Sequence, residues 1–131
     1  MRVRQTVIEA MIAHARAEAP LECCGLLLGR GDLIDESVPA TNIRASAVAY
    51  CVDPRDHFAA IRRARATDRR VIGAYHSHPS SPPAPSPTDV AEAFDAELLY
   101  VIVSLQRGEP EIRAYRMESG NFTERSLVPE P

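Results

Sequence analysis

Two histidines separated by one residue, His76 and His78, stand at the end of an apolar segment. On a β-strand, residues i and i+2 point to the same face, so both imidazoles can bind one metal ion. Asp89 would be a third ligand if the intervening loop returns it to the strand end. Two histidines and one carboxylate leave a fourth tetrahedral position open, which is typical of catalytic zinc. Zinc acidifies water and polarises a carbonyl, so the pattern predicts peptide hydrolysis at neutral pH.

A hydrolase of this kind also needs a general base, and Glu22 is the candidate. It opens an apolar segment, a place where a carboxylate tends to be partly buried. Burial raises the pKa of a carboxyl group, which suits it to accept a proton and then donate it. The alternative interpretation is an ordinary solvated acid, the default for an isolated glutamate.

The pair Ser86 and Asp89 also fits a purely structural pattern. Ser-x-x-Asp before an apolar stretch is a capping box, in which the two side chains satisfy backbone groups at a helix start. A helix start at Ser86 would itself present Asp89 to the metal ion. The sequence leaves open whether Ser86 is a helix cap, a catalytic hydroxyl or both.

Other protein classes that carry a His-x-His pair fit this chain poorly. A cupin needs a glutamate a few residues on, where Pro82 and Pro83 stand, and a histidine-triad protein needs a third histidine at Ser80. A zinc deaminase needs H-x-E and P-C-x-x-C, which this chain lacks. An amidohydrolase barrel needs ~250 residues, about twice this chain. An ordinary surface pair of histidines is disfavoured once Asp89 and Glu22 are taken into account.

The order of these residues resembles the signature of the JAMM (MPN-plus, Mov34/PAD1-like) metallopeptidases. That signature is a distant glutamate, then H-[ST]-H-P, then S-x-x-D. This chain reads Glu22, then His76-Ser77-His78-Pro79, then Ser86-Pro87-Thr88-Asp89. Its segment PLECCGLLLG is similar to the family's P-x-E-x-C-G, and the resemblance extends over nearly the whole chain.

The resemblance implies roles for five residues. His76, His78 and Asp89 would bind one Zn²⁺, Glu22 would deprotonate the attacking water, and Ser86 would help to stabilise the tetrahedral oxyanion. It also implies the JAMM/MPN (cytidine-deaminase-like) fold, an α/β (α+β) architecture with a mixed β-sheet flanked by helices.

The resemblance further implies a substrate class. Members of the family cleave peptide or isopeptide bonds after the Gly-Gly tail of ubiquitin or a ubiquitin-like protein. This short chain looks like the compact bacterial type, similar to peptidases that act on a small sulfur-carrier protein. Two alternatives remain, a non-catalytic MPN-type binding scaffold and a zinc hydrolase of small amides.

Composition sets the remaining expectations. The chain has 131 residues, the size of one domain, so we expect a single domain over residues 1–131. Its net charge of −3 argues against nucleic acid or an anionic membrane as the main partner. The three cysteines include the adjacent Cys23 and Cys24, which does not suggest a disulfide framework and favours the cytoplasm. We find no apolar run long enough to span a membrane.

Apolar periodicity and breaker residues predict the elements that must position these side chains. Asp53 followed by Pro54 indicates a helix N-terminus, and a further helix is expected from Ser86. The polar tail after Gly120 receives no assignment. We expect helices over residues 5–18 and 53–68, and strands over 22–29, 33–38, 48–52, 69–78, 97–105 and 111–117.

Overall fold

Apolar spacing and capping residues determine where the two long helices form. In the computed structural model, which describes residues 1–131, helix α1 spans Gln5–Glu18 and buries its apolar stripe. Helix α2 spans Pro54–Ala66 and begins at the predicted cap, because the Asp53 carboxylate accepts the backbone N–H of Arg55. It ends before residue 68, since Asp68 adopts a positive φ of 54°.

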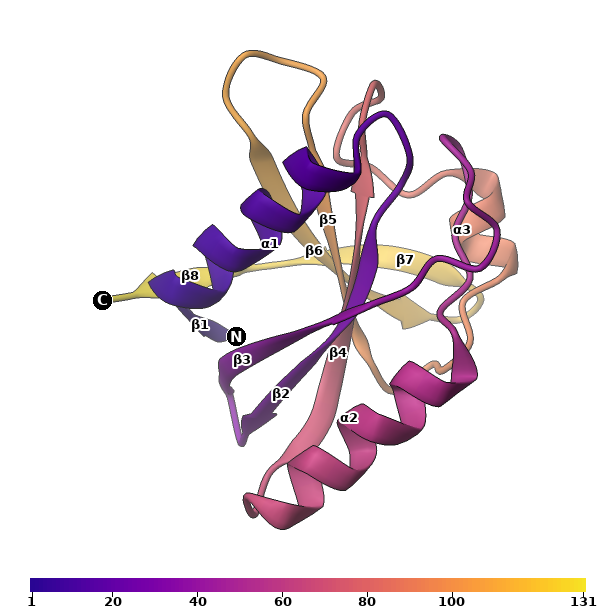
Figure 1. The fold of residues 1–131 in the computed structure, drawn as a ribbon. Coiled ribbons are helices and arrows are strands. Elements are labelled where there is room, and N and C mark those ends of the chain that lie inside the picture. The colour runs from indigo at the N-terminus through magenta and orange to yellow at the C-terminus, as the bar shows by residue number, and fades with distance from the viewer.

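The strands form one eight-stranded sheet with the order β7-β6-β5-β4-β2-β3-β1-β8 (Figure 1). Strand β4 lies near its middle, antiparallel to β2 and parallel to β5. The strands are β1 (Arg2–Arg4), β2 (Cys24–Arg30), β3 (Leu33–Ala40), β4 (Arg70–His78), β5 (Leu99–Ser104), β6 (Glu111–Glu118), β7 (Asn121–Arg125) and β8 (Val128–Glu130), and a short helix α3 spans Pro87–Ala91.

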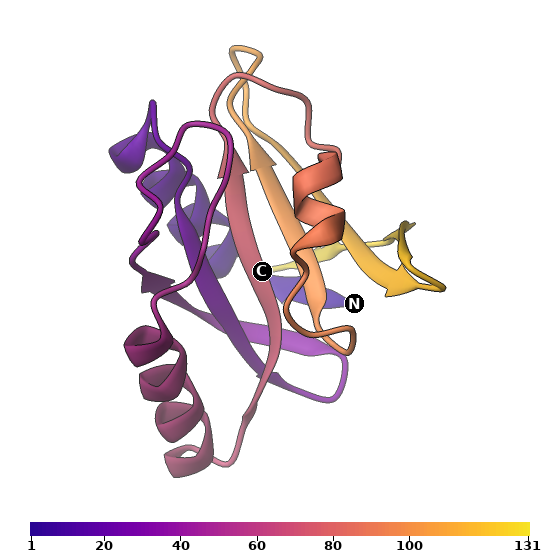
Figure 2. The same cartoon turned by 90° about the vertical axis from the view of Figure 1, so that its right-hand side faces the viewer.

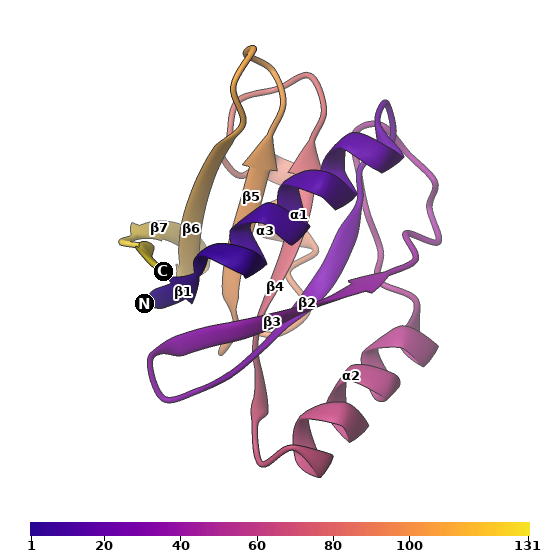
Figure 3. The same cartoon turned by 60° about the vertical axis from the view of Figure 1, so that its left-hand side comes forward.

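Helices cover both faces of the sheet, and alternate residues of each central strand serve the two faces. In β2, Leu27 packs in the cluster with α1, whereas Leu26 and Leu28 pack with α2. In β4, Tyr75 belongs to the α1 side and Ala74 to the α2 side. Figure 3 shows α1 across one face with α3 behind the sheet, and Figure 2 shows α3 in front of the sheet. Because His76 and His78 follow Ala74 at intervals of two, they lie on the face that carries α2 and α3.

The fold class, a mixed sheet flanked by helices, is confirmed, but several element predictions differ from the structure. The predicted strand over residues 48–52 is wrong, because that stretch is a loop with one isolated bridge between Asn42 and Val52. The Asn42 side chain binds the backbone of Ala49 and Cys51, which turns the loop back on itself. Strands β1, β7 and β8 were not predicted, since such short, mostly polar strands carry little apolar alternation. Neither the length nor the apolar content of any of these helices reaches what a membrane-spanning helix requires.

Candidate metal centre

The pairing of β2 with β4 determines which side chains meet at the strand end. Cys24 lies opposite His76 in the antiparallel register. The pairing continues one residue further, because the Ser77 N–H donates to the Cys23 carbonyl. Residues directly opposite each other in an antiparallel pair point to the same face. Extended by one more residue, this register sets Glu22 opposite His78, which places the glutamate on the face of the two histidines.

The serine between the histidines secures this register from the other face. The Ser77 hydroxyl accepts a hydrogen bond of 2.8 Å from the Cys23 backbone N–H, and its side chain is fully buried. The backbone of Glu22 is held independently by the loop after β3, since its N–H donates to Ser46 and its carbonyl accepts from Asn42. The main chain is therefore bound to the loop after β3 at Glu22 and to β4 at Cys23.

Asp89 reaches the histidines from α3, through the predicted capping box. The Ser86 hydroxyl accepts the Asp89 backbone N–H at 3.0 Å, and the Ser86 backbone N–H donates to Asp89 Oδ2 at 2.9 Å. Pro87 occupies the first helical turn, where its missing N–H carries no penalty. The helix start itself thus aims the Asp89 carboxylate.

Three atoms with lone pairs converge in a nearly equilateral triangle. The Nε2 atoms of His76 and His78 lie 3.2 Å apart, and Asp89 Oδ2 lies 3.1 Å and 3.0 Å from them. A tetrahedral zinc ion with ligand distances of about 2.0–2.1 Å would separate its ligand atoms by about 3.3 Å. The three side chains are buried and form a group that could hold a metal ion.

The hydrogen bonding of His78 supports this assignment. Its Nδ1 lies 2.7 Å from the Pro82 carbonyl, which can only accept, so Nδ1 carries the proton and neutral His78 presents a bare Nε2. That bare nitrogen faces the Asp89 carboxylate oxygen, another acceptor, at 3.0 Å. Two acceptors at this distance repel unless a cation or proton lies between them. The donor set fits a metal ion.

Three buried polar atoms around this triangle lack a hydrogen-bond partner. They are Glu22 Oε1, His76 Nδ1 and Asp89 Oδ1. Such atoms are rare in folded proteins and gather at functional sites. The His76 ring is held instead by stacking on Tyr50, with ring centroids 4.3 Å apart.

The electrostatics of the site separate the two carboxylates. Glu22 is only 4% exposed, and burial raises its pKa to about 7, helped by the Asp89 charge and opposed by His78. Burial also acts on Asp89, but the two imidazoles and the Ser86 N–H outweigh it and hold its pKa well below the usual range. Asp89 is therefore a permanent anion at neutral pH, whereas Glu22 can exchange a proton. Burial lowers the pKa of His76, which keeps it in the neutral form that binds metals.

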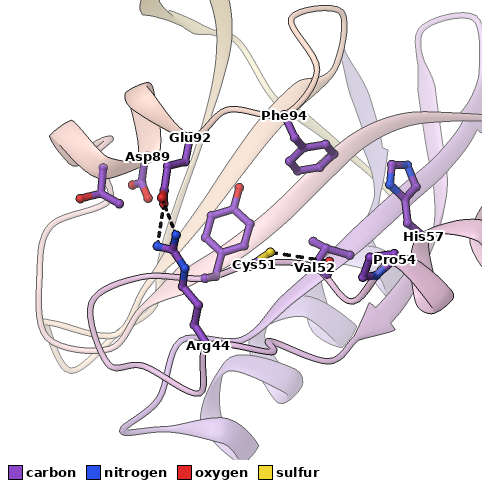
Figure 4. A pocket seen from close by; sticks show the side chains of 10 residues that line it. Arg44, Cys51, Val52, Pro54, His57, Asp89, Glu92 and Phe94 are labelled. Carbon is purple, nitrogen blue, oxygen red and sulfur yellow. Dashed lines mark hydrogen bonds and ion pairs between the residues drawn. The ribbon is translucent and has the colours of Figure 1, made fainter.

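A cavity of about 300 Å³ opens beside Asp89 (Figure 4). Its walls come from the loop after β3, the start of α2 and the α3 segment. The Arg44 guanidinium joins the first and third walls through an ion pair with both carboxylate oxygens of Glu92, one of them at 2.7 Å. The remaining lining residues are Tyr50, Cys51, Val52, Pro54, His57, Thr88 and Phe94.

The structure brings all five predicted site residues into one region. The two histidines and Asp89 touch one another, Ser86 binds Asp89, and the charge of Glu22 interacts with His78 and Asp89. Sequence reasoning missed other contributors to this region. Tyr50 and Arg44 lie in the loop wrongly predicted to contain a strand, and no motif marks them.

Comparison with known proteins identifies the family. Residues 4–118 match the family described as prokaryotic homologs of the JAB domain. The chain is 34% identical over 125 residues to the CysO-cysteine peptidase of Mycobacterium tuberculosis, covering 93% of this chain and 86% of that protein. It is 31% identical over 129 residues to the desampylase of Haloferax volcanii, covering 93% and 91% of the two chains.

Solved structures share the fold. The solution structure of a protein from Desulfitobacterium hafniense matches with a TM-score of 0.92 and 32% identity, covering 99% of this chain and 93% of that one. A JAB1/MPN domain protein from Archaeoglobus fulgidus matches with a TM-score of 0.66 at 20% identity, covering 98% of each chain, which shows the fold alone. With the converging histidines and aspartate at the end of β4, these matches show that the chain belongs to the prokaryotic homologues of the JAB domain, as its JAMM signature predicted.

Proposed function

We propose that this chain is a zinc peptidase that cleaves the bond after the C-terminal Gly-Gly tail of a small ubiquitin-like or sulfur-carrier protein. The names of two relatives, a CysO-cysteine peptidase and a desampylase, support a hydrolase acting on such conjugates. In this proposal residues 1–131 act as one catalytic domain, since a single sheet joins residues 2 to 130. The three cysteines are free, which suits a reducing compartment such as the cytoplasm.

The observation that carries the proposal is the triangle formed by His76 Nε2, His78 Nε2 and Asp89 Oδ2, with the buried Glu22 beside it. Two nitrogen ligands and one carboxylate favour zinc and leave a position open for substrate. A bound Zn²⁺ would polarise the scissile carbonyl and make water more acidic.

Glu22 acts as general base and then as general acid. Its carboxylate takes a proton from water as the water oxygen forms a bond to the carbonyl carbon. When the carbon–nitrogen bond breaks, Glu22 returns that proton to the leaving amine, so the carboxylate is regenerated. A pKa of about 7 suits both steps, because the group accepts and releases a proton with little cost near neutral pH.

Ser86 supplies a hydrogen bond to the carbonyl oxygen as negative charge develops there. Its capping role does not compete with this one. The cap uses a lone pair of the hydroxyl oxygen, since Asp89 N–H is the donor, and the hydroxyl hydrogen stays available. The cavity beside Asp89 offers space for the residues next to the scissile bond.

An intact-mass assay tests the proposal. A sulfur-carrier protein extended by cysteine after Gly-Gly, and the same carrier joined to a lysine side chain, are incubated with the zinc-loaded chain. We expect loss of the extension at the Gly-Gly terminus, and no loss with Glu22→Ala or after chelation. Hydrolysis confined to small acyl amides would favour the small-amide alternative. A chain that binds no zinc and cleaves nothing would be a binding scaffold, and the proposal would be wrong.

A further inference from the structure

The segment between the second histidine and the capping box, residues 79–86, is held in an unusual way. Prolines at 79, 82, 83 and 85 have no backbone N–H, and residues 79–85 make no backbone–backbone hydrogen bond. Its conformation therefore depends on side chains from elsewhere that donate to its carbonyl groups. This segment links the ligand His78 to Ser86 and Asp89, so its conformation bears on the metal site.

Three successive carbonyls of this segment each accept a hydrogen bond from a different strand. The Ser81 carbonyl accepts from the Ser104 hydroxyl on β5 at 2.6 Å, and the Pro82 carbonyl accepts from His78 Nδ1 on β4 at 2.7 Å. The Pro83 carbonyl accepts from the Tyr115 hydroxyl on β6 at 2.7 Å. The middle bond is the one that fixes the tautomer of a ligand.

The side chain of Tyr115 is held in place by its neighbours. The residue is 8% exposed, its ring stacks on Phe122 of β7, and its backbone lies opposite Tyr100 of β5. It touches neither the ligand atoms nor the cavity beside Asp89. Any effect of its hydroxyl on the metal site must pass through the segment 79–86.

We propose that Tyr115 is a positioning residue of the metal centre, because its hydroxyl holds Pro83 so that the adjacent Pro82 carbonyl keeps the proton of His78 on Nδ1. His78 then presents a bare Nε2 toward the metal ion. The inference rests on the proposed function, since it requires that His78 binds a metal.

Tyr100 provides a matched control. Its hydroxyl also donates to a backbone carbonyl at 2.7 Å, and it is buried on the neighbouring strand directly opposite Tyr115. That carbonyl belongs to Asp95, outside the segment 79–86. The same hydroxyl accepts the Asp95 backbone N–H at 2.9 Å. Tyr100→Phe therefore removes two hydrogen bonds and costs at least the stability lost in Tyr115→Phe, about 1–2 kcal/mol, but leaves the segment intact.

The test measures Zn²⁺ binding by competition with a chromophoric chelator, and the tautomer of His78 in the metal-free protein by nitrogen NMR of the imidazole. We expect Tyr115→Phe to weaken zinc binding about fivefold to tenfold and to populate the Nε2–H tautomer of His78. Tyr100→Phe should match the wild type within about twofold in affinity and keep the Nδ1–H tautomer.

The outcomes separate this inference from the proposed function. If Tyr115→Phe keeps the zinc affinity and the His78 tautomer of the wild type, as Tyr100→Phe is expected to do, the positioning role is overturned while the metal site stands. Equal weakening in both variants would also overturn it, because the effect would then reflect general stability. A wild-type chain that binds no zinc would overturn the metal site, and the positioning role with it.

Discussion

The two halves of the metal site are built by different means. The pairing of the central strands β2 and β4 places Glu22, His76 and His78, because one register fixes all three. Asp89 comes from a helix of five residues at the end of a proline-rich segment, and it is aimed by a capping box. The first, the sheet half, depends on a ladder of main-chain hydrogen bonds. The second, the loop half, consists of Ser86 and Asp89 with the segment 79–86 and depends on single contacts between side chains and backbone.

The two halves respond differently to substitution. A change in register would move every side chain of β4 to the other face, so the sheet half either forms completely or does not form. The loop half has no such cooperativity, and each of its contacts is worth about 1 kcal/mol. Substitutions in the two halves should therefore have different signatures, even where both abolish the same activity.

We expect the greatest loss of zinc affinity when a ligand from either half is removed. His76→Ala and Asp89→Ala should each weaken zinc binding by on the order of 10³-fold, because each removes one of three protein ligands. Only Asp89→Ala also removes the acceptor of the Ser86 N–H, so amide hydrogen exchange over residues 86–92 should accelerate in that variant alone. Zinc titration and exchange measured on the metal-free proteins check both points. Similar exchange in the two variants would contradict the proposed difference between the halves.

The next effect concerns the chemistry performed by the sheet half. Glu22→Gln keeps the shape and the backbone contacts of the residue but removes the base, so hydrolysis should fall by about 10³-fold. Zinc should still bind stoichiometrically, since Glu22 is not among the three converging ligands. The measurement is kcat together with zinc content. A variant that loses zinc in parallel with activity would show that Glu22 acts as a ligand.

In the loop half, Ser86 carries two proposed roles that substitution can separate. Glycine is almost as good a helix N-cap as serine, but it has no hydroxyl. If the hydroxyl stabilises the oxyanion, Ser86→Gly should lower kcat by about 10²-fold with little change in the unfolding temperature. Near wild-type kcat in Ser86→Gly, with a loss only in Ser86→Ala, would reduce Ser86 to a helix cap.

Much of the sheet half was predictable from the sequence, for a physical reason. The strand over residues 69–78 contains a continuous apolar run, the helix over 5–18 carries helical apolar spacing, and the spacing of His76 and His78 fixes their common face. The position of Glu22 opposite His78 was not derivable, because register depends on which strands pair. The prediction that Glu22 lies near the histidines came instead from the resemblance to the JAMM signature.

In the loop half, the capping box was predictable from the sequence, but the hydrogen bonds that hold the segment 79–86 were not. The capping box of Ser86 and Asp89 is local, so four adjacent residues sufficed to predict it. The bonds from Ser104 and Tyr115 to the segment 79–86 join residues 23 and 32 positions apart. They arise only once β5 pairs with β4 and β6 pairs with β5, and neither residue type marks such a role in a sequence.

The smallest expected effect is a pH dependence of stability that belongs to the sheet half. In the metal-free protein the pKa of Glu22 rises from 4.5 to about 7, so the folded state binds this proton more tightly than the unfolded chain. The stabilisation from this proton is present below pH 4.5 and is lost as the pH rises through about 7.

At pH 8 a charged, buried Glu22 therefore destabilises the fold, and metal-free Glu22→Gln should be more stable than the wild type by about 1–2 kcal/mol after allowance for solvent screening. The gap should narrow by more than half at pH 5. Urea unfolding at the two pH values measures it, with Glu109→Gln in the exposed turn before β6 as the control. A gap that is constant with pH would show that Glu22 is not desolvated in the folded state.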